Sequence, residues 1–528
     1  MLRPTGWNGS PPGAANTPPA SGGGAGAFGS IVAANASGQA RQATIVVGGA
    51  TLTITQPPTE RTYYLAEGAT GPFFDLDIAV ANPNDAPANA EVTFLNDEGQ
   101  THSMTVPLGP KAQRIIRVND VPGLEAAAVS TVVKSPGGAP LIVERTMFWD
   151  RAGYYGGHGG SAVDGPRTKW YFAEGSQGFF DTYVLLANAT ATTAQVTVTF
   201  LLDATDAGPV EISVPVTANS RKTLWAGDYP ALVNRAFSIV VTSDVPVIAE
   251  RAMYFPGAIS GVPGKRPWEG GHESAGVAEA ATTWFHAEGA TGDFFDEYIL
   301  IGNPGTTAAT LTLTFLLDDG RVIQVQGTLP GERRMTVNVE TVADDVALGR
   351  FTLLAGNPAL LRDAQVSTTV TSTVPVISER AMYWSGDFTS WYEAHNSFGV
   401  TQTAVRWGLA EGRTGGPLGF DTYILLANPN ASPVAVEVTL LRQGGRPPLQ
   451  RTFTVPATSR FNVQANIDPI GADPGWGALG LQPGEAFGAL VRSVDPSKPV
   501  AVGRAMYWFG HDALFWTGGT TATAVPLP

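Results

Sequence analysis

The sequence predicts an all-β fold: a tandem array of four Ig-like β-sandwich modules after a partial N-terminal β-sandwich. Two observations predict this fold. A set of short motifs recurs four times in the same order, at a period above 100 residues, which is the size of a domain rather than of a solenoid turn. Between the motifs, apolar and polar residues alternate with period two, as at 196–200, 311–315 and 436–440. This alternation is typical of half-buried antiparallel strands, and about seven such runs per copy, with no convincing helix, indicate a sandwich.

Each copy opens with Ala-Glu-Gly, continues with Phe-Asp, and closes with an arginine two residues before a methionine. We interpret the recurring Glu, Asp and Arg as a buried ion-pair network, since charges can be buried when they are paired. The candidates are Glu67, Asp75 and Arg145 in the first copy, Glu174, Asp181 and Arg251 in the second, Glu288, Asp296 and Arg380 in the third, and Glu411, Asp421 and Arg504 in the fourth.

The motifs divide the chain into residues 59–165, 166–279, 280–403 and 404–528, here called modules 1 to 4, after a segment at 1–58. We expect the modules to follow one another in series. Val-Pro pairs such as Val245-Pro246 and Val374-Pro375 are expected at strand ends, because proline cannot donate to a ladder.

Modules 3 and 4 are longer than the first two, and their extra residues fall at about 342–365 and 468–485. Insertions at one loop of a repeated scaffold vary a surface and leave the core intact. These two loops are therefore the first candidates for binding another molecule.

The N-terminal segment does not match the repeat. A Gly-rich lead is followed by an Ala-Ala-Asn-x-Ser-Gly turn and a hairpin around Gly48-Gly49 that ends in Thr-Ile-Thr-Gln. Over about 40 residues this segment resembles the C-terminal half of a BACON domain, a bacterial β-sandwich associated with carbohydrate-active proteins. The resemblance implies a sandwich whose opening strands come from a longer gene product or from a neighbouring molecule.

The four-fold unit, best seen at 412–429, resembles repeats of the Ala-Glu-Gly-x-Thr-Gly and Phe-Asp-Thr-Tyr-Ile-Leu-Leu-Ala-Asn-Pro type. Such repeats belong to secreted and wall-associated proteins of high-GC and thermophilic bacteria. The resemblance covers residues of about 62–520 and implies an extracellular or cell-surface location.

The repeated polar residues are also of the types that serve catalysis or bind metals. Paired carboxylates serve glycoside hydrolysis, but four equivalent active sites in one chain would be unusual. Carboxylates also bind calcium, although the sequence has no Asp-x-Asp-x-Asp-Gly loop. His158, His272 and His395 come one per module, whereas a zinc site needs three or four converging ligands, so we expect hydrogen-bonded junction residues.

Six tryptophans flank the same junctions and could stack on sugar rings. We favour packing between strands or modules, because large aromatics dominate cores and interfaces. They are Trp149, Trp170, Trp284, Trp384, Trp407 and Trp508.

Composition excludes several function classes. The net charge is −14 with no basic cluster, and the chain has no cysteine, so nucleic acid, disulfides and thiolate sites are not expected. The sequence contains no run of 18 apolar residues, so no membrane span is predicted. No nucleotide or hydrolase motif occurs, so no enzyme activity, catalytic residue, cofactor or metal ligand is predicted.

We therefore expect a non-enzymatic extracellular structural or adhesive protein: a cell-surface stalk, filament or layer subunit. Its partners would be copies of itself or other surface proteins, joined by strand donation at the incomplete N-terminal domain. The alternative is a carbohydrate-binding accessory protein of the bacterial surface, with polysaccharide as its ligand.

Overall fold

A computed structural model of the chain describes residues 14–16, 30–32, 41–47, 50–56 and 60–527, except 97–98, 150–155, 207, 257–269, 385–390, 472 and 510–515. Nearly all regular elements are strands, and the predicted all-β sandwich architecture is confirmed. No helix of the described residues has the length and hydropathy that a membrane crossing requires.

Each module is a pair of antiparallel sheets built on four strands apiece. In module 1 the first sheet runs β5 (Arg61–Leu65), β10 (Val129–Ser135), β7 (Ala88–Asn96), β8 (Thr101–Leu108), and the second runs β12 (Gly156–Ser161), β11 (Ile142–Trp149), β6 (Phe74–Asn82), β9 (Ala112–Arg117), followed by the short helix η1 (Val118–Asp120).

Module 2 repeats this plan with one long strand shared by both sheets. Its strands are β13 (Arg167–Phe172), β14 (Ser176–Gln177), β15 (Asp181–Asn188), β16 (Ala194–Leu202), β17 (Val210–Val216), β18 (Ser220–Trp225), β19 (Arg235–Phe255) and β20 (Gly270–Ala275), with the short helices η2 (Ala226–Asp228) and η3 (Pro230–Leu232).

Module 3 also shares one long strand between its sheets. Its elements are β21 (Ala281–His286), β22 (Phe295–Asn303), β23 (Ala309–Leu317), β24 (Val322–Leu329), β25 (Arg333–Asn338), η4 (Val339–Thr341), α1 (Val342–Ala347), β26 (Thr352–Ala355), η5 (Pro358–Arg362), β27 (Val366–Trp384) and β28 (Glu393–Phe398). The insertion thus holds one short α-helix and an extra edge strand, which the sequence did not predict.

Module 4 returns to separate strands, as in module 1. Its elements are β29 (Arg406–Leu409), β30 (Arg413–Thr414), β31 (Asp421–Asn428), β32 (Val434–Arg442), η6 (Gln443–Gly445), β33 (Leu449–Val455), β34 (Ser459–Gln464), η7 (Gly477–Leu479), β35 (Glu485–Ser493), β36 (Ala501–Trp508), β37 (Gly518–Thr523) and β38 (Val525–Pro526).

The period-two alternation places one face of each central strand in the core. Along β16, Val196, Val198 and Phe200 are buried while Gln195 is exposed. Burying one such side chain contributes about 1.5–3 kcal/mol, so the alternation fixes which face of the strand turns inward.

The two Val-Pro pairs predicted at strand ends in modules 2 and 3 lie instead inside the long strands β19 and β27. Ladder pairing with β16 stops at Ser243, and pairing with β15 starts at Ile248. Pro246 therefore sits where the chain leaves one sheet and enters the other, and no ladder bond needs its missing N–H.

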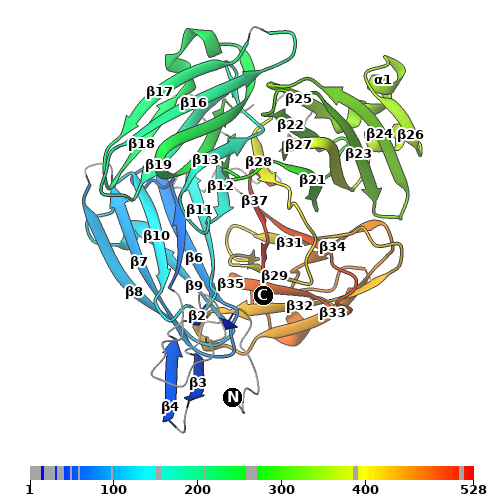
Figure 1. Cartoon of the computed structure of the whole chain (residues 1–528). Helices are drawn as coiled ribbons and strands as arrows, with labels where there is room; N and C mark the ends of the chain where they lie inside the picture. The colour runs from blue at the N-terminus through cyan, green and yellow to red at the C-terminus, as the bar shows by residue number, and fades with distance from the viewer. Residues whose placement is uncertain are drawn as a thin grey trace.

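The four modules form a closed ring, not the linear series expected from the sequence (Figure 1). At its centre β12 contacts β20 and β37, and β28 contacts the same two strands. Module 4 returns to module 1, where Arg442 of β32 pairs with Ala112 of β9. One sheet consequently runs through both terminal modules.

Glycines make the close approach at the ring centre possible. A Cβ on Gly157 would lie 2.8 Å from the ring of Trp508, and one on Gly519 would lie 2.8 Å from Trp384, distances at which the neighbour must move. Each pair joins two adjacent modules. Three of the four central strands contain at least two glycines, and none has a clear alternating pattern, which is why the sequence predicted seven strands per module instead of eight.

In the N-terminal segment, β1 (Ala14–Asn16) pairs with β2 (Ser30–Val32), and β3 (Arg41–Val47) pairs with β4 (Ala50–Gln56). The β3–β4 register, with Val47 opposite Ala50, agrees with the predicted hairpin. Within the described residues, β3 and β4 pair with no further strand.

Candidate functional site at the module junctions

The recurring charged residues meet at the four interfaces of the ring, here called junctions 1/2, 2/3, 3/4 and 4/1 after the modules they join. At junction 1/2, Glu250 of module 2 reaches into module 1. Its Oε1 accepts a hydrogen bond from the backbone N–H of Ala66 at 2.8 Å, and its Oε2 accepts one from Arg145 at 2.8 Å. The glutamate therefore ties a backbone turn and an arginine of the neighbouring module together.

The same arrangement occurs at two more junctions. At junction 2/3, Glu379 accepts from the N–H of Ala173 and from Arg251, both at 2.7 Å. At junction 4/1, Glu144 accepts from the N–H of Ala410 at 2.7 Å, and Arg504 donates to it at 2.9 Å.

The sequence produces this pattern because each of these glutamates directly precedes the closing arginine of its own module. Neighbouring residues on a strand point to opposite faces. Glu250 can thus reach back to module 1 while Arg251 reaches forward to module 3. Modules 1, 2 and 3 each carry such a Glu-Arg pair, and their glutamates bind the arginine of the neighbouring module at three of the four junctions.

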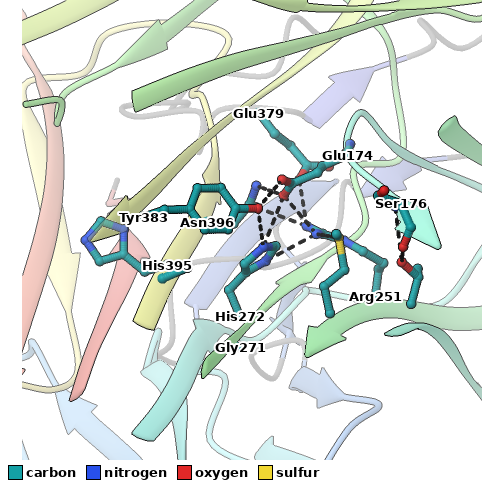
Figure 2. Close-up of polar contacts among 12 residues, drawn as sticks. Glu174, Ser176, Arg251, Gly271, His272, Glu379, Tyr383, His395 and Asn396 are labelled. Atoms are coloured by element: carbon teal, nitrogen blue, oxygen red, sulfur yellow. Dashed lines mark hydrogen bonds and ion pairs between the residues drawn. The ribbon is translucent and has the colours of Figure 1, made fainter. Parts of the chain in front are cut away.

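Figure 2 shows this network at junction 2/3. The guanidinium of Arg251 lies between Glu174 of its own module, at 3.0 Å, and Glu379 of module 3. Asn396 accepts from Arg251 at 3.1 Å and donates to Glu174 at 2.7 Å. Arg251 and Glu379 are fully buried, so each charge depends on its partner across the interface.

The three junction histidines do not gather at one site. At three junctions, histidine Nε2 lies 3.0–3.1 Å from a tyrosine hydroxyl of the next module, and that hydroxyl donates to the opening glutamate of the histidine's module. The three sets are His158–Tyr254–Glu67, His272–Tyr383–Glu174 and His395–Tyr507–Glu288.

Burial controls the protonation of these groups. It lowers the pKa of His272 to about 3 and that of His395 to about 4, so both rings are neutral at pH 7. It raises the pKa of Glu67 to about 6 and that of Glu379 to about 7, even though an arginine beside each carboxylate opposes the shift. The histidines therefore act as hydrogen-bonding groups and not as cations.

Junction 4/1 replaces the histidine and the tyrosine together. Module 4 carries Thr520 where the others carry histidine, and module 1 carries Phe148 where the others carry tyrosine. These two positions come from opposite ends of the repeat array and are partners only in a closed ring. Thr146, at a position that is alanine in the other modules, donates to Glu411 there.

The central aromatic positions vary in the same paired way. Trp149, Trp384 and Trp508 each lie against a glycine of an adjacent module. At the equivalent positions of the remaining pair the chain has Phe255 and Ala394. The smaller aromatic side chain, Phe255, thus occurs with the one position that carries a methyl group, Ala394, as close packing requires.

Three of the four recurring aspartates accept hydrogen bonds from tryptophans, which the predicted Glu/Asp–Arg network did not include. Asp181 accepts from the indole N–H of Trp225 at 3.1 Å, Asp296 from Trp391 at 2.5 Å, and Asp421 from Trp516 at 2.9 Å. Asp75 lies at the matching position of β6. The carboxylates that contact the closing arginines across three junctions belong to the glutamates that directly precede those arginines in each module.

One group of side chains has metal-ligand character. Glu67, His158 and Glu273 offer atoms within 4.8 Å of one another, all buried. However, Arg145 Nη2 lies 2.5 Å from Glu273 and 3.6 Å from Glu67. The guanidinium already supplies positive charge between the two carboxylates, so these residues suit an ion-pair network better than a cation site.

The six junction tryptophans are each 2% exposed or less. Their ring faces are therefore not available for stacking on sugars. These tryptophans are packed inside the protein. Two cavities beside the junctions measure about 10 and 20 Å³, which is room only for water or comparably small molecules. Substrate-sized pockets are typically 300–1,000 Å³.

Comparisons with known proteins add little. No family model matches the chain, and no curated protein is similar to it. Among solved structures, Thermotoga maritima 1070 is 21% identical with a TM-score of 0.18, over 22% of this chain and 96% of that chain. The Anabaena sensory rhodopsin transducer is 27% identical with a TM-score of 0.14, over 16% of this chain and 92% of that chain. TM-scores this low establish no shared fold.

Proposed function

We propose that this chain is a non-enzymatic structural or adhesive protein of the bacterial cell surface, in which a rigid ring of four sandwiches presents variable loops. One observation carries the proposal. The repeated glutamates, arginines and histidines that could perform chemistry are buried in the module interfaces, where they bind one another. A substrate could reach them only if the ring opened.

The outer surface supports a role in contacts. Exposed large apolar side chains are concentrated in the two insertions: Leu348, Leu353 and Leu354 in module 3, and Ile470 and Leu479 in module 4, with exposures of 40–68%. The edge strand β26 (Thr352–Ala355) is exposed along its whole length. Apolar residues on an open sheet edge favour association with another chain.

A cell-surface location is supported by composition and by the repeat resemblance. Only 15% of residues are charged, below the ~25% of an average soluble domain. The two-stranded β3–β4 sheet, which pairs with no other described strand, is compatible with strand exchange between copies.

The test measures self-association and retention on a surface. Sedimentation velocity of the full chain over a concentration series, with co-sedimentation on isolated bacterial cell walls, should show assembly or wall binding. Leu353→Ser with Leu354→Ser should weaken it several-fold, whereas Val494→Ser, at a position 47% exposed outside both insertions, should not. A chain that stays monomeric at all concentrations and does not bind cell walls would contradict the proposal.

A carbohydrate-binding role is the second candidate, and one observation favours it. Trp225 is 38% exposed, stacks on Tyr183 at 6.3 Å between ring centroids, and donates to Asp181. An aromatic face beside a carboxylate can bind the apolar and hydroxyl-bearing sides of a sugar. Binding on a glycan array that Trp225→Ala abolishes would favour this role, and an array without signal would exclude it.

A further inference from the structure

Junction 3/4 lacks the glutamate that the other three junctions share. Module 4 carries Gly503 where the other modules carry Glu144, Glu250 and Glu379. The groups that would bind the carboxylate are still present: the backbone N–H of Ala287 and the guanidinium of Arg380 occupy the equivalent positions.

The place of the missing side chain is a cavity of about 20 Å³, lined by Ala287, Arg380, Gly503 and Thr521 among others. A Cβ on Gly503 would approach no atom closer than 3.5 Å, so the space begins at the glycine itself. His286 also lines the cavity, and its Nδ1 has no hydrogen-bond partner among the described residues.

The charges around this cavity are unbalanced. Two buried guanidinium groups, Arg380 and Arg460, face Glu288. Burial raises the pKa of Glu297 to about 8, and burial lowers the pKa of His286 to about 3 and that of His395 to about 4. At pH 7 these three side chains are neutral, so the junction holds two cations and one ionised carboxylate.

The occupied junctions show which anion fits. In all three, one glutamate oxygen accepts the alanine N–H and the other accepts the arginine, at distances of 2.7–2.9 Å. A ligand with two oxygens on one carbon reproduces both bonds. A halide or a water has a single atom and cannot bridge both donors in the same way.

We propose that the cavity at junction 3/4 binds a small carboxylate anion of the size of formate, which takes the place of the glutamate side chain absent at Gly503. The anion completes the fourth interface of the ring. The ligand thereby couples the stability of the ring to the concentration of a small organic acid.

The test compares sodium formate with sodium chloride at equal ionic strength. For the full native chain, formate should raise the melting temperature saturably and chloride should not. Gly503→Glu supplies its own carboxylate, so it should melt above the native protein and lose the formate response. Gly503→Ala is the matched control: the cavity has room for its methyl group, and it should keep the response.

A direct measurement makes the test independent of the variants. Carbon-13 formate titrated against the native chain should show saturable binding of one equivalent, displaced by acetate and not by chloride. Unsaturable or absent binding, or an equal effect of formate on the native protein and on Gly503→Glu, would overturn the proposal and leave a water-filled cavity.

Discussion

Removing the charge of Glu144 should destabilise the protein strongly, because this carboxylate is the only charged partner that Arg504 contacts among the described residues. Both side chains are fully buried, and their closest N–O distance is 2.9 Å. Two unit charges about 4 Å apart attract by roughly 4 kcal/mol at an effective dielectric constant of 20. Breaking a buried pair by removing one partner costs about 3–5 kcal/mol.

We therefore expect Glu144→Gln to lower the free energy of unfolding by at least about 3 kcal/mol, measured by urea denaturation with tryptophan fluorescence. The matched control is Glu437→Gln. Its partner Arg492 lies at 3.1 Å, but the two side chains are 20% and 48% exposed, and such pairs contribute roughly 0.2–1 kcal/mol. If both variants lower the free energy of unfolding by the same small amount, the idea that buried ion pairs close the ring is refuted.

Three further predictions use the same unfolding assay. Phe148→Tyr and Thr520→His should be energetically coupled by more than about 0.5 kcal/mol in a double-mutant cycle, whereas additive effects would mean that modules 1 and 4 do not touch. Burial raises the pKa of Glu297 from 4.5 to about 8, so the folded state holds a proton that the unfolded state releases, and stability should fall as pH rises between these values. Glu297→Gln should make this fall smaller, and an unchanged slope would contradict the assignment. Gly157→Ala should cost about 1–3 kcal/mol by overpacking, because its Cβ would lie 2.8 Å from a tryptophan ring, whereas Gly208→Ala, with no atom within 4 Å, should be nearly neutral.

The strands inside each module could be predicted from the sequence because their burial is local. Val196, Val198 and Phe200 alternate with polar residues, and that alternation alone fixes which face is buried. The central strand β37 (Gly518–Thr523) could not be predicted in this way. Its residues are set by close contact with another module, and glycine has low β-propensity.

The network was predicted only in part, for a related reason. Arg145 is fully buried, but one of its carboxylate partners, Glu250, lies 105 positions away in the next module. Examining the motifs of one module by itself could not identify a partner that lies in another module. A comparison between different modules could have identified it. Module 4 has Thr520 in place of histidine, and module 1 has Phe148 in place of tyrosine; this paired change already indicates that the first and last modules are adjacent.

Closure of the ring is the central claim, and small-angle X-ray scattering of the full chain tests it most directly. A compact chain of this length should have a radius of gyration of roughly 24 Å. Four modules in a line, each with a radius of gyration of roughly 13 Å, would give about 40 Å. A value close to 24 Å, unchanged by dilution, agrees with the ring, and a value near 40 Å would contradict it.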